Sequence, residues 1–166
     1  MKDFHKAVPS RCEFCWCPMS IAAERGRMDF CKSFAEMNIL SKYKCSYWSL
    51  IFSVQAGHLD ISKFLYNEVE QTNHRRNQFQ LTYQYLAAKN GHLEIVKYIS
   101  GYLENKNPAR NDGGTPLHVA AQVGHLEIVK YIAGHLEDKN PAANDGGTPL
   151  YVAALNGHLE IVKHIA

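Results

Sequence analysis

The sequence has almost no net charge and no long apolar run. Its 166 residues hold 18 Lys and Arg against 16 Asp and Glu, a formal net charge of +2 at pH 7. This excess is too small for a dedicated nucleic-acid binder, so we expect no nucleic-acid partner. No segment approaches the roughly 20 apolar residues of a membrane-spanning helix, and the start of the chain lacks the apolar stretch of a secretory signal. The sequence therefore predicts a cytoplasmic protein with no membrane partner.

Cysteine is scarce and confined to the start of the chain. The five cysteines are Cys12, Cys15, Cys17, Cys31 and Cys45, and their odd number excludes a complete internal disulfide framework. Cys12, Cys15 and Cys17 have spacings at which thiolates bind zinc, but a strong zinc site shows a second pair of cysteines, which is missing. We therefore expect free thiols, with no metal and no cofactor. A zinc-stabilised N-terminal module is the alternative.

Sequence signatures of catalysis are also missing. The chain has no phosphate-binding loop, no nucleophile elbow and no pair of catalytic carboxylates. Gly113-Gly114 and Gly146-Gly147 are not preceded by a strand or followed by the lysine of a nucleotide-binding loop. The sequence thus predicts neither an enzyme nor a small-molecule substrate.

What the chain does contain is an internal repeat. The heptapeptide GHLEIVK that begins at Gly91 returns unchanged at Gly124 and at Gly157, both times after 33 residues. Residues 111–133 and 144–166 agree at 19 of 23 positions. With two weaker copies upstream, this periodicity predicts a tandem array. The predicted organisation is an N-terminal cysteine-containing segment, 1–16, then one array over 17–166 with units at 17–44, 45–76, 77–109, 110–142 and 143–166.

The sequence of each unit predicts two short helices. Thr115 can cap the first helix and Pro116 suits its first position, while Gly124 ends the helix in a left-handed turn. A polar segment rich in turn-forming residues, 106–114, and its later copy predict projecting loops between units. A single helix pair has nothing on which to bury its apolar side, so the units must stack.

The length of the second helix follows from its apolar spacing. It should begin near His125 or Leu126, and Leu136 continues the helical spacing of its aliphatic residues. We therefore expect this helix to extend to about Glu137, with Gly134 inside it. The polar residues 67–80 predict a loop.

The recurring histidines and glutamates are predicted to have structural roles rather than to bind a metal or take part in catalysis. His58, His92, His125 and His158 occupy one equivalent position in successive units. Equivalent residues in a stacked array lie about 8–10 Å apart, which is too wide for one zinc ion. We expect structural histidines, and we expect the repeated glutamates of the second helices to be surface residues.

The segment DGGTPLH, Asp112 to His118, together with the GHLEIVK helix, resembles the ankyrin repeat. The resemblance is strong over residues 81–166 and patchy upstream. It implies an all-α fold, a helix-turn-helix solenoid of about five stacked repeats with projecting hairpin loops. The third unit departs from the pattern with Gln84 and Tyr85 in place of Leu-His, and the fifth has Tyr151 in place of the histidine.

The resemblance also implies function. It predicts a scaffold or adaptor that binds an unidentified protein partner in the concave groove formed by the loop tips and the first-helix ends. Residues 110–133 differ from 143–166 at five positions, and three of these fall in the predicted groove. The expected contact residues are Lys89, Asn90, Arg110, Asn111, Asp112, Gln122, Val123, Asn144, Asp145, Leu155 and Asn156.

Three further expectations remain open. Ala166 precedes the expected end of the last second helix, so the fifth unit is predicted to be truncated and the chain a fragment. The array would then be able to serve as the targeting arm of a larger enzyme or ubiquitin ligase. The resemblance also matches Asn107 and Asn140 to an asparagine that a hydroxylase modifies in ankyrin arrays, although proline replaces the alanine that usually follows it.

Overall fold

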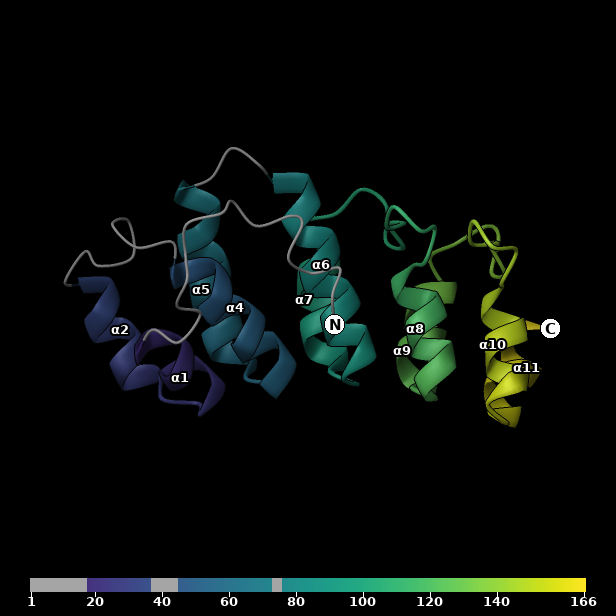
Figure 1. The fold of residues 1–166 in the computed structure, drawn as a ribbon, viewed down its shortest axis with the longest axis horizontal. Helices are drawn as coiled ribbons and strands as arrows, with labels where there is room; N and C mark the ends of the chain where they lie inside the picture. The colour runs from purple at the N-terminus through teal and green to yellow at the C-terminus, as the bar shows by residue number, and fades with distance from the viewer. Residues whose placement is uncertain (1–17, 37–44, 73–75) are drawn as a thin grey trace.

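In the described part of the chain, the helices are joined by turns and loops, and there is no strand. The computed structural model describes residues 18–36, 45–72 and 76–166. Its helices form an elongated row in chain order (Figure 1). They are α1 (Pro18–Glu24), α2 (Met28–Glu36), α4 (Cys45–Ala56), α5 (Leu59–Thr72), α6 (Arg76–Lys89), α7 (Leu93–Ser100), α8 (Pro116–Val123), α9 (Leu126–Ala133), α10 (Pro149–Leu155) and α11 (Leu159–Ile165).

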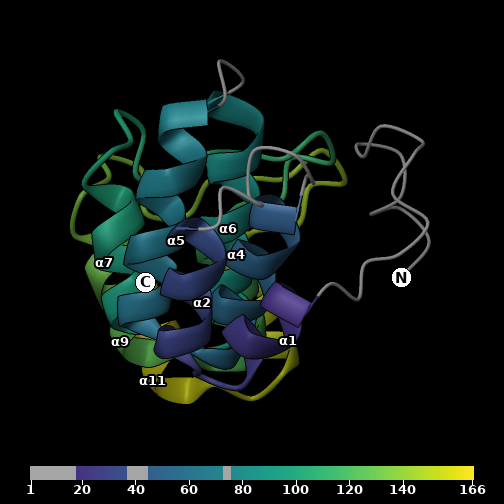
Figure 2. The ribbon, with the colours of Figure 1, turned by 90° about the vertical axis from the view of Figure 1, so that its left-hand side faces the viewer.

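The helices stack as pairs in two layers. First helices pack on first helices, in the order α1, α4, α6, α8, α10, and second helices on second helices, in the order α2, α5, α7, α9, α11. Viewed along the row, α7 and α9 lie on one side and α1 and α4 toward the other (Figure 2). The first helices pack on one another more extensively than the second helices do. The stacked helix pairs confirm the predicted solenoid, and we call the layer of first helices its inner side.

Helix α8, the first helix of the fourth unit, begins and ends with the capping residues that the sequence predicts. The Thr115 side chain accepts a hydrogen bond from the backbone N–H of His118, and Pro116 occupies the first position of α8. Gly124 ends the helix at φ 96°, a left-handed conformation that L side chains rarely adopt. These sequence predictions are confirmed.

A histidine at the start of each later second helix joins its unit to the preceding one. In each case Nε2 lies 2.9–3.1 Å from a backbone carbonyl oxygen of the preceding unit. Because a carbonyl oxygen only accepts, the ring nitrogen must donate. The pairs are His58 with Glu24, His92 with Gln55, His125 with Lys89, and His158 with Gln122. The predicted structural role of the four histidines is confirmed.

The same four imidazole rings cover a glycine of the preceding unit. A Cβ added at Gly26, Gly57, Gly91 or Gly124 would lie only 2.5–2.9 Å from Cε1 of the covering ring. Each of these glycines also has a positive φ. Glycine is thus required twice at this position, for its backbone conformation and for the space that the ring occupies.

The second helix is shorter than predicted. We expected it to reach about Glu137, but α9 ends at Ala133. Gly134 keeps helical dihedrals, φ −64° and ψ −14°, and the next two N–H groups bond to carbonyls only three residues back. This tighter 3₁₀-type turn still lets Leu136 pack against the core. The helical spacing of Leu136 therefore reflected its contact with the core and not its secondary structure.

The prediction of a loop over residues 67–80 is also wrong. Helix α5 continues to Thr72 and α6 begins at Arg76, so most of this segment is helical. The segment is polar, but it contains neither glycine nor proline, the residues that end helices most effectively. Composition alone misled the prediction here.

The third unit carries a polar group where the fourth has an apolar one. Gln84 is fully buried in the position that Leu117 occupies one unit later. Its Nε2 donates to Ser100 Oγ over 2.9 Å and to the Lys106 carbonyl oxygen over 2.8 Å. The Nε2 group is thus satisfied, whereas the buried Oε1 of Gln84 has no hydrogen-bond partner among the described residues, and the stack continues through the substitution.

His118 links α8 to the loop of the following unit. Its Nε2 donates to the Gly147 carbonyl oxygen over 3.1 Å, and its Nδ1 lies 2.8 Å from Thr115 Oγ1. Burial lowers the pKa of His118 below its ordinary value of 6.5, with the Gly147 carbonyl opposing the shift. The fold therefore favours the neutral ring.

Gly124 and Gly157 provide a matched test of the ring-over-glycine contact. Both have positive φ, but only Gly124 is covered by a histidine, and an added Cβ at Gly157 meets nothing within 4 Å. Gly157→Ala should lower the unfolding free energy by roughly 1–2 kcal/mol through backbone strain alone. Gly124→Ala should cost at least about 1 kcal/mol more, because His158 must move. Urea unfolding of both variants measures the difference, and equal losses would contradict the proposed contact.

The pH dependence of stability tests the environment of His118. A lowered pKa in the folded state means that the unfolded chain binds more protons as the pH falls through about 6.5. The contribution of the neutral His118 ring to the unfolding free energy is therefore complete above that pH, and it is lost as the pH falls below it. We expect His118→Tyr to reduce the slope of unfolding free energy against pH between about 7.5 and 5.5. An unchanged slope, measured by chemical unfolding at each pH, would show that the ring titrates alike in both states.

Candidate functional site

The predicted contact residues lie in two rows at opposite ends of the first helices. One row occupies the loops before α8 and α10, and the other the carboxyl ends of α6, α8 and α10 (Figure 1). An eight-residue helix such as α8 separates the rows by about 12 Å. The loop row contains Arg110, Asn111, Asp112, Asn144 and Asp145, and the helix-end row contains Lys89, Asn90, Gln122, Val123, Leu155 and Asn156. The structure thus does not gather these residues into one cluster.

Each loop is closed by its own backbone. The Arg110 N–H donates to the Gly114 carbonyl oxygen, and the Gly113 N–H donates back to the Arg110 carbonyl oxygen, both over 2.9 Å. The Asp112 carboxylate accepts from the Gly114 N–H, and Asp145 repeats this bond in the next loop. Both aspartates therefore hold their turns, in the projecting hairpin-like form that was predicted.

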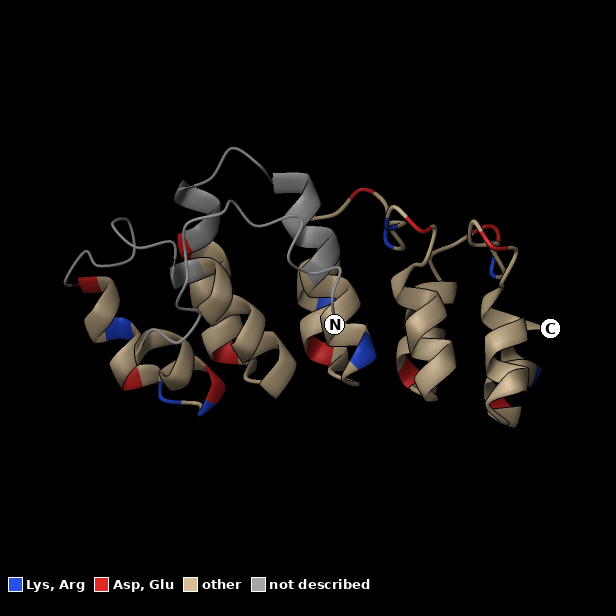
Figure 3. Ribbon diagram, viewed as in Figure 1, with Lys and Arg blue, Asp and Glu red and all other residues tan. Residues whose placement is uncertain are grey.

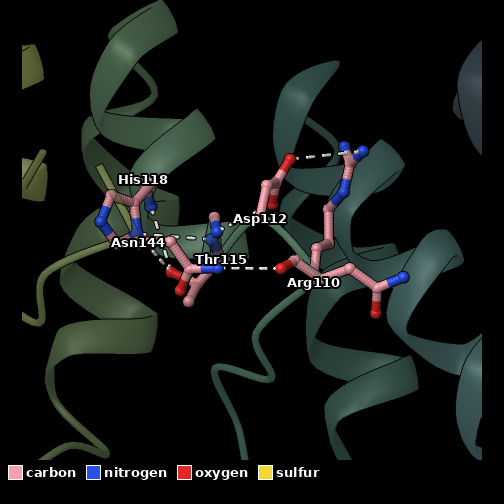
Figure 4. Close-up of polar contacts among 7 residues, drawn as sticks. Arg110, Asp112, Thr115, His118 and Asn144 are labelled. Carbon is pink, nitrogen blue, oxygen red and sulfur yellow. Dashed lines mark hydrogen bonds and ion pairs between the residues drawn. The ribbon is translucent and has the colours of Figure 1, made fainter. Parts of the chain in front are cut away.

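Asn144 joins the two loops. Its backbone N–H donates to the Asp112 carbonyl oxygen over 3.2 Å, and its Nδ2 donates to the Asn111 carbonyl oxygen over 2.9 Å. Figure 4 shows Asn144 beside Asp112 and below His118. The loop row is thus a connected edge of the stack, in which backbone hydrogen bonds fix the position of each tip.

Arg110 is held in place on this edge. Its guanidinium carbon lies 4.6 Å from the ring centroid of Tyr85, and its Nη2 is 3.6 Å from the Asp112 carboxylate. Figure 4 shows the Arg110 and Asp112 side chains facing each other. Tyr85 was not among the predicted contact residues. Its position in the repeat could have identified it. Tyr85 is equivalent to His118 and Tyr151, a position at which the fourth and fifth units differ.

The helix-end row divides into two kinds of side chain. Asn90 and Asn156 each donate their amide to a carbonyl oxygen four residues back, over 2.8 Å, and so close their own helices. The other members, Lys89, Gln122, Val123 and Leu155, are exposed. Val123 and Leu155 are large apolar residues with 45% and 71% of their surface exposed. This row therefore offers both apolar and polar contacts to another molecule.

Charges on the second helices occur as short-range pairs. The repeated glutamate contacts the lysine three residues later at 2.7–2.8 Å in α7, α9 and α11. These side chains are largely exposed, which confirms their prediction as surface residues. On the face seen in Figure 3, positions of both signs are interspersed along the described units. Exposed pairs of this kind contribute little to stability.

Cys31 is buried in the core, where its thiol is unreactive. Burial raises the pKa of Cys31 to about 11, and the nearby Asp29 carboxylate adds to this shift. A thiol with this pKa remains protonated at neutral pH and is a poor nucleophile. The predicted zinc-binding candidates Cys12, Cys15 and Cys17 lie outside the described residues.

Within the residues that the structure describes, no three His, Cys, Asp or Glu side chains come together in an arrangement that would hold a metal ion. No helix in this part of the chain combines the length and the apolar character needed to cross a membrane.

Comparison with known proteins identifies the family. No curated protein matches the chain significantly. The family model described as ankyrin repeats (3 copies) matches residues 50–142 and, in an overlapping second match, residues 84–166. Together the two matches cover more than half of the chain, including the stacked pairs from α6 to α11 and the loops between them. On this evidence, the chain belongs to the ankyrin repeat family.

Proposed function

We propose that this ankyrin array is a protein-interaction scaffold whose partner lies along the inner, first-helix side. Ankyrin repeats are in general protein–protein interaction modules. The observation that carries the proposal is how the fourth and fifth units differ. Their core aliphatic residues are identical, whereas exposed positions change, as in Gln122 against Leu155 and Val123 against Asn156; among the buried residues, His118 is replaced by Tyr151. A surface that varies on a constant framework is suited to recognising a particular partner.

Arg110 is the strongest candidate contact in the loop row. Stacking on Tyr85 and pairing with Asp112 restrict its guanidinium before any partner binds. Pre-organisation of this kind lowers the entropy lost on binding, and Arg and Tyr are enriched among the residues that dominate interface energies. We infer that Arg110 and Tyr85 act together.

In the helix-end row, the exposed side chains would supply most of the binding energy. Lys89, Gln122, Val123 and Leu155 extend from the ends of successive first helices, and Leu155 offers the largest exposed apolar surface of the four. The hydrogen-bonded residues Asn90, Asn144, Asn156, Asp112 and Asp145 would act mainly by shaping the turns.

Affinity capture with the intact chain tests this surface. The double variant Arg110→Glu with Leu155→Glu changes both rows, and its partner should bind about 30-fold or more weakly, the effect of losing about 2 kcal/mol. The matched control, Lys130→Glu with Tyr102→Glu, places the same two charges at exposed positions on the second-helix side.

The control should retain the partner, and circular dichroism should show both variants folded. Partners that the groove variant and the control retain equally would show that binding lies elsewhere. Loss of partners from the control alone would place the interface on the second helices.

A further inference from the structure

Lysines on the two sides of the array differ in their ion pairing. On the second helices, Lys97, Lys130 and Lys163 each contact a glutamate three residues earlier, at 2.7–2.8 Å. Lys89, at the end of α6 on the inner side, is exposed and forms no ion pair with any residue that the structure describes. Its ammonium group is therefore available to a carboxylate of another molecule.

Arg110 places a second cation beside Lys89. Tyr85 and Lys89 are four residues apart in α6, so their side chains are neighbours on one face of the helix. The guanidinium carbon of Arg110 lies 4.6 Å from the ring centroid of Tyr85. The two cations are thus neighbours on the inner side, where the third unit meets the fourth.

Asp112 neutralises this pair of cations only in part. Its carboxylate faces Arg110 (Figure 4), but it lies 3.6 Å from Nη2, which is longer than a hydrogen bond, and it also accepts from the Gly114 N–H. A guanidinium has five N–H donors in a planar fork, so Arg110 can bind a second carboxylate beside Asp112. Two cations against one carboxylate leave this part of the inner side positively charged.

The junction between the fourth and fifth units lacks both cations. Gln122 takes the place of Lys89, and Ala143 takes the place of Arg110. The loop of Ala143 is nevertheless closed by the same two backbone hydrogen bonds, to Gly147 and from Gly146, over 2.8 and 2.9 Å. The fold therefore needs neither cation, and both side chains are free to serve recognition.

Two units further along, the same row of side chains becomes apolar. Leu155 occupies the position of Lys89 and Gln122, and it is 71% exposed. This position is also exposed at Gln122, although the fifth unit packs on the fourth, so it belongs to the open inner side of the array. With helix pairs about 8–10 Å apart, Lys89 and Leu155 are separated by roughly 16–20 Å, the length of about five or six residues of extended chain.

We propose that the inner side recognises an extended, acidic segment of its protein partner. Arg110 and Lys89 bind an aspartate or glutamate carboxylate of that segment, and an apolar side chain about five or six residues away packs on Leu155. Complementary charge selects such a segment, because a basic one would meet two cations of like sign. The inference rests on the function proposed above and adds the chemistry of the partner.

Selection of random peptides on the intact chain, from a phage-displayed library long enough to span both sites, tests the proposal. Selected peptides should be enriched in Asp and Glu. By fluorescence anisotropy, they should bind the double variant Lys89→Gln with Arg110→Ala at least about tenfold more weakly. Both replacements copy the residues of the next unit, Gln122 and Ala143, so the variant should fold. The control, Lys97→Gln with Lys130→Ala, removes the same net charge from the second helices and should bind as the wild type does.

A third variant, Leu155→Glu, separates failure of this inference from failure of the proposed function. Peptides that lose binding to Leu155→Glu but show no excess of acidic residues overturn the acidic segment and retain the inner side as the binding surface. Peptides that bind all variants as they bind the wild type, or a selection without a specific binder, overturn both. Equal weakening by the double variant and its control overturns the inference as well, since net charge alone would then attract the peptides. Circular dichroism checks that every variant is folded.

Discussion

The contact on which the rest of the structure depends is an imidazole that covers a left-handed glycine and donates to a carbonyl of the preceding unit. Most of the stabilisation comes from burying the aliphatic residues between units, at roughly 1.5–3 kcal/mol for each large side chain. The single hydrogen bond adds only about 1 kcal/mol. Apolar burial has no direction, however, whereas the bond from His125 to Lys89 fixes where one helix pair sits on the next.

This arrangement separates framework from recognition. The aliphatic core residues and the loop asparagine, Asn111 or Asn144, are the same in the fourth and fifth units, and packing and hydrogen bonding constrain these positions. The exposed positions on the inner side carry no such constraint. There the chain places Arg110 on Tyr85, and it exposes apolar side chains at Val123 and Leu155. The proposed partner surface is thus one that the fold leaves free to vary.

The fold was largely predictable from the sequence because caps and turns are local. Thr115, Pro116 and Gly124 act through their own backbone, and the 33-residue period revealed the stack. Errors arose where tertiary contacts decide. Leu136 has helical spacing but reaches the core through a 3₁₀-type turn, and most of the polar segment 67–80 is helical because polar residues other than glycine and proline are compatible with a helix. The stacking of Arg110 on Tyr85 joins separate units, and no local pattern encodes that contact.

The central claim is that stability comes from contacts between neighbouring helix pairs. Duplicating one unit tests this claim most directly. A second copy of residues 110–142 inserted after Ala142 adds 33 residues in register and one further interface. If stability is a sum over units and interfaces, urea unfolding should give both a higher unfolding free energy and a larger m-value. An inserted unit that leaves both values unchanged would show that the array does not gain its stability by stacking.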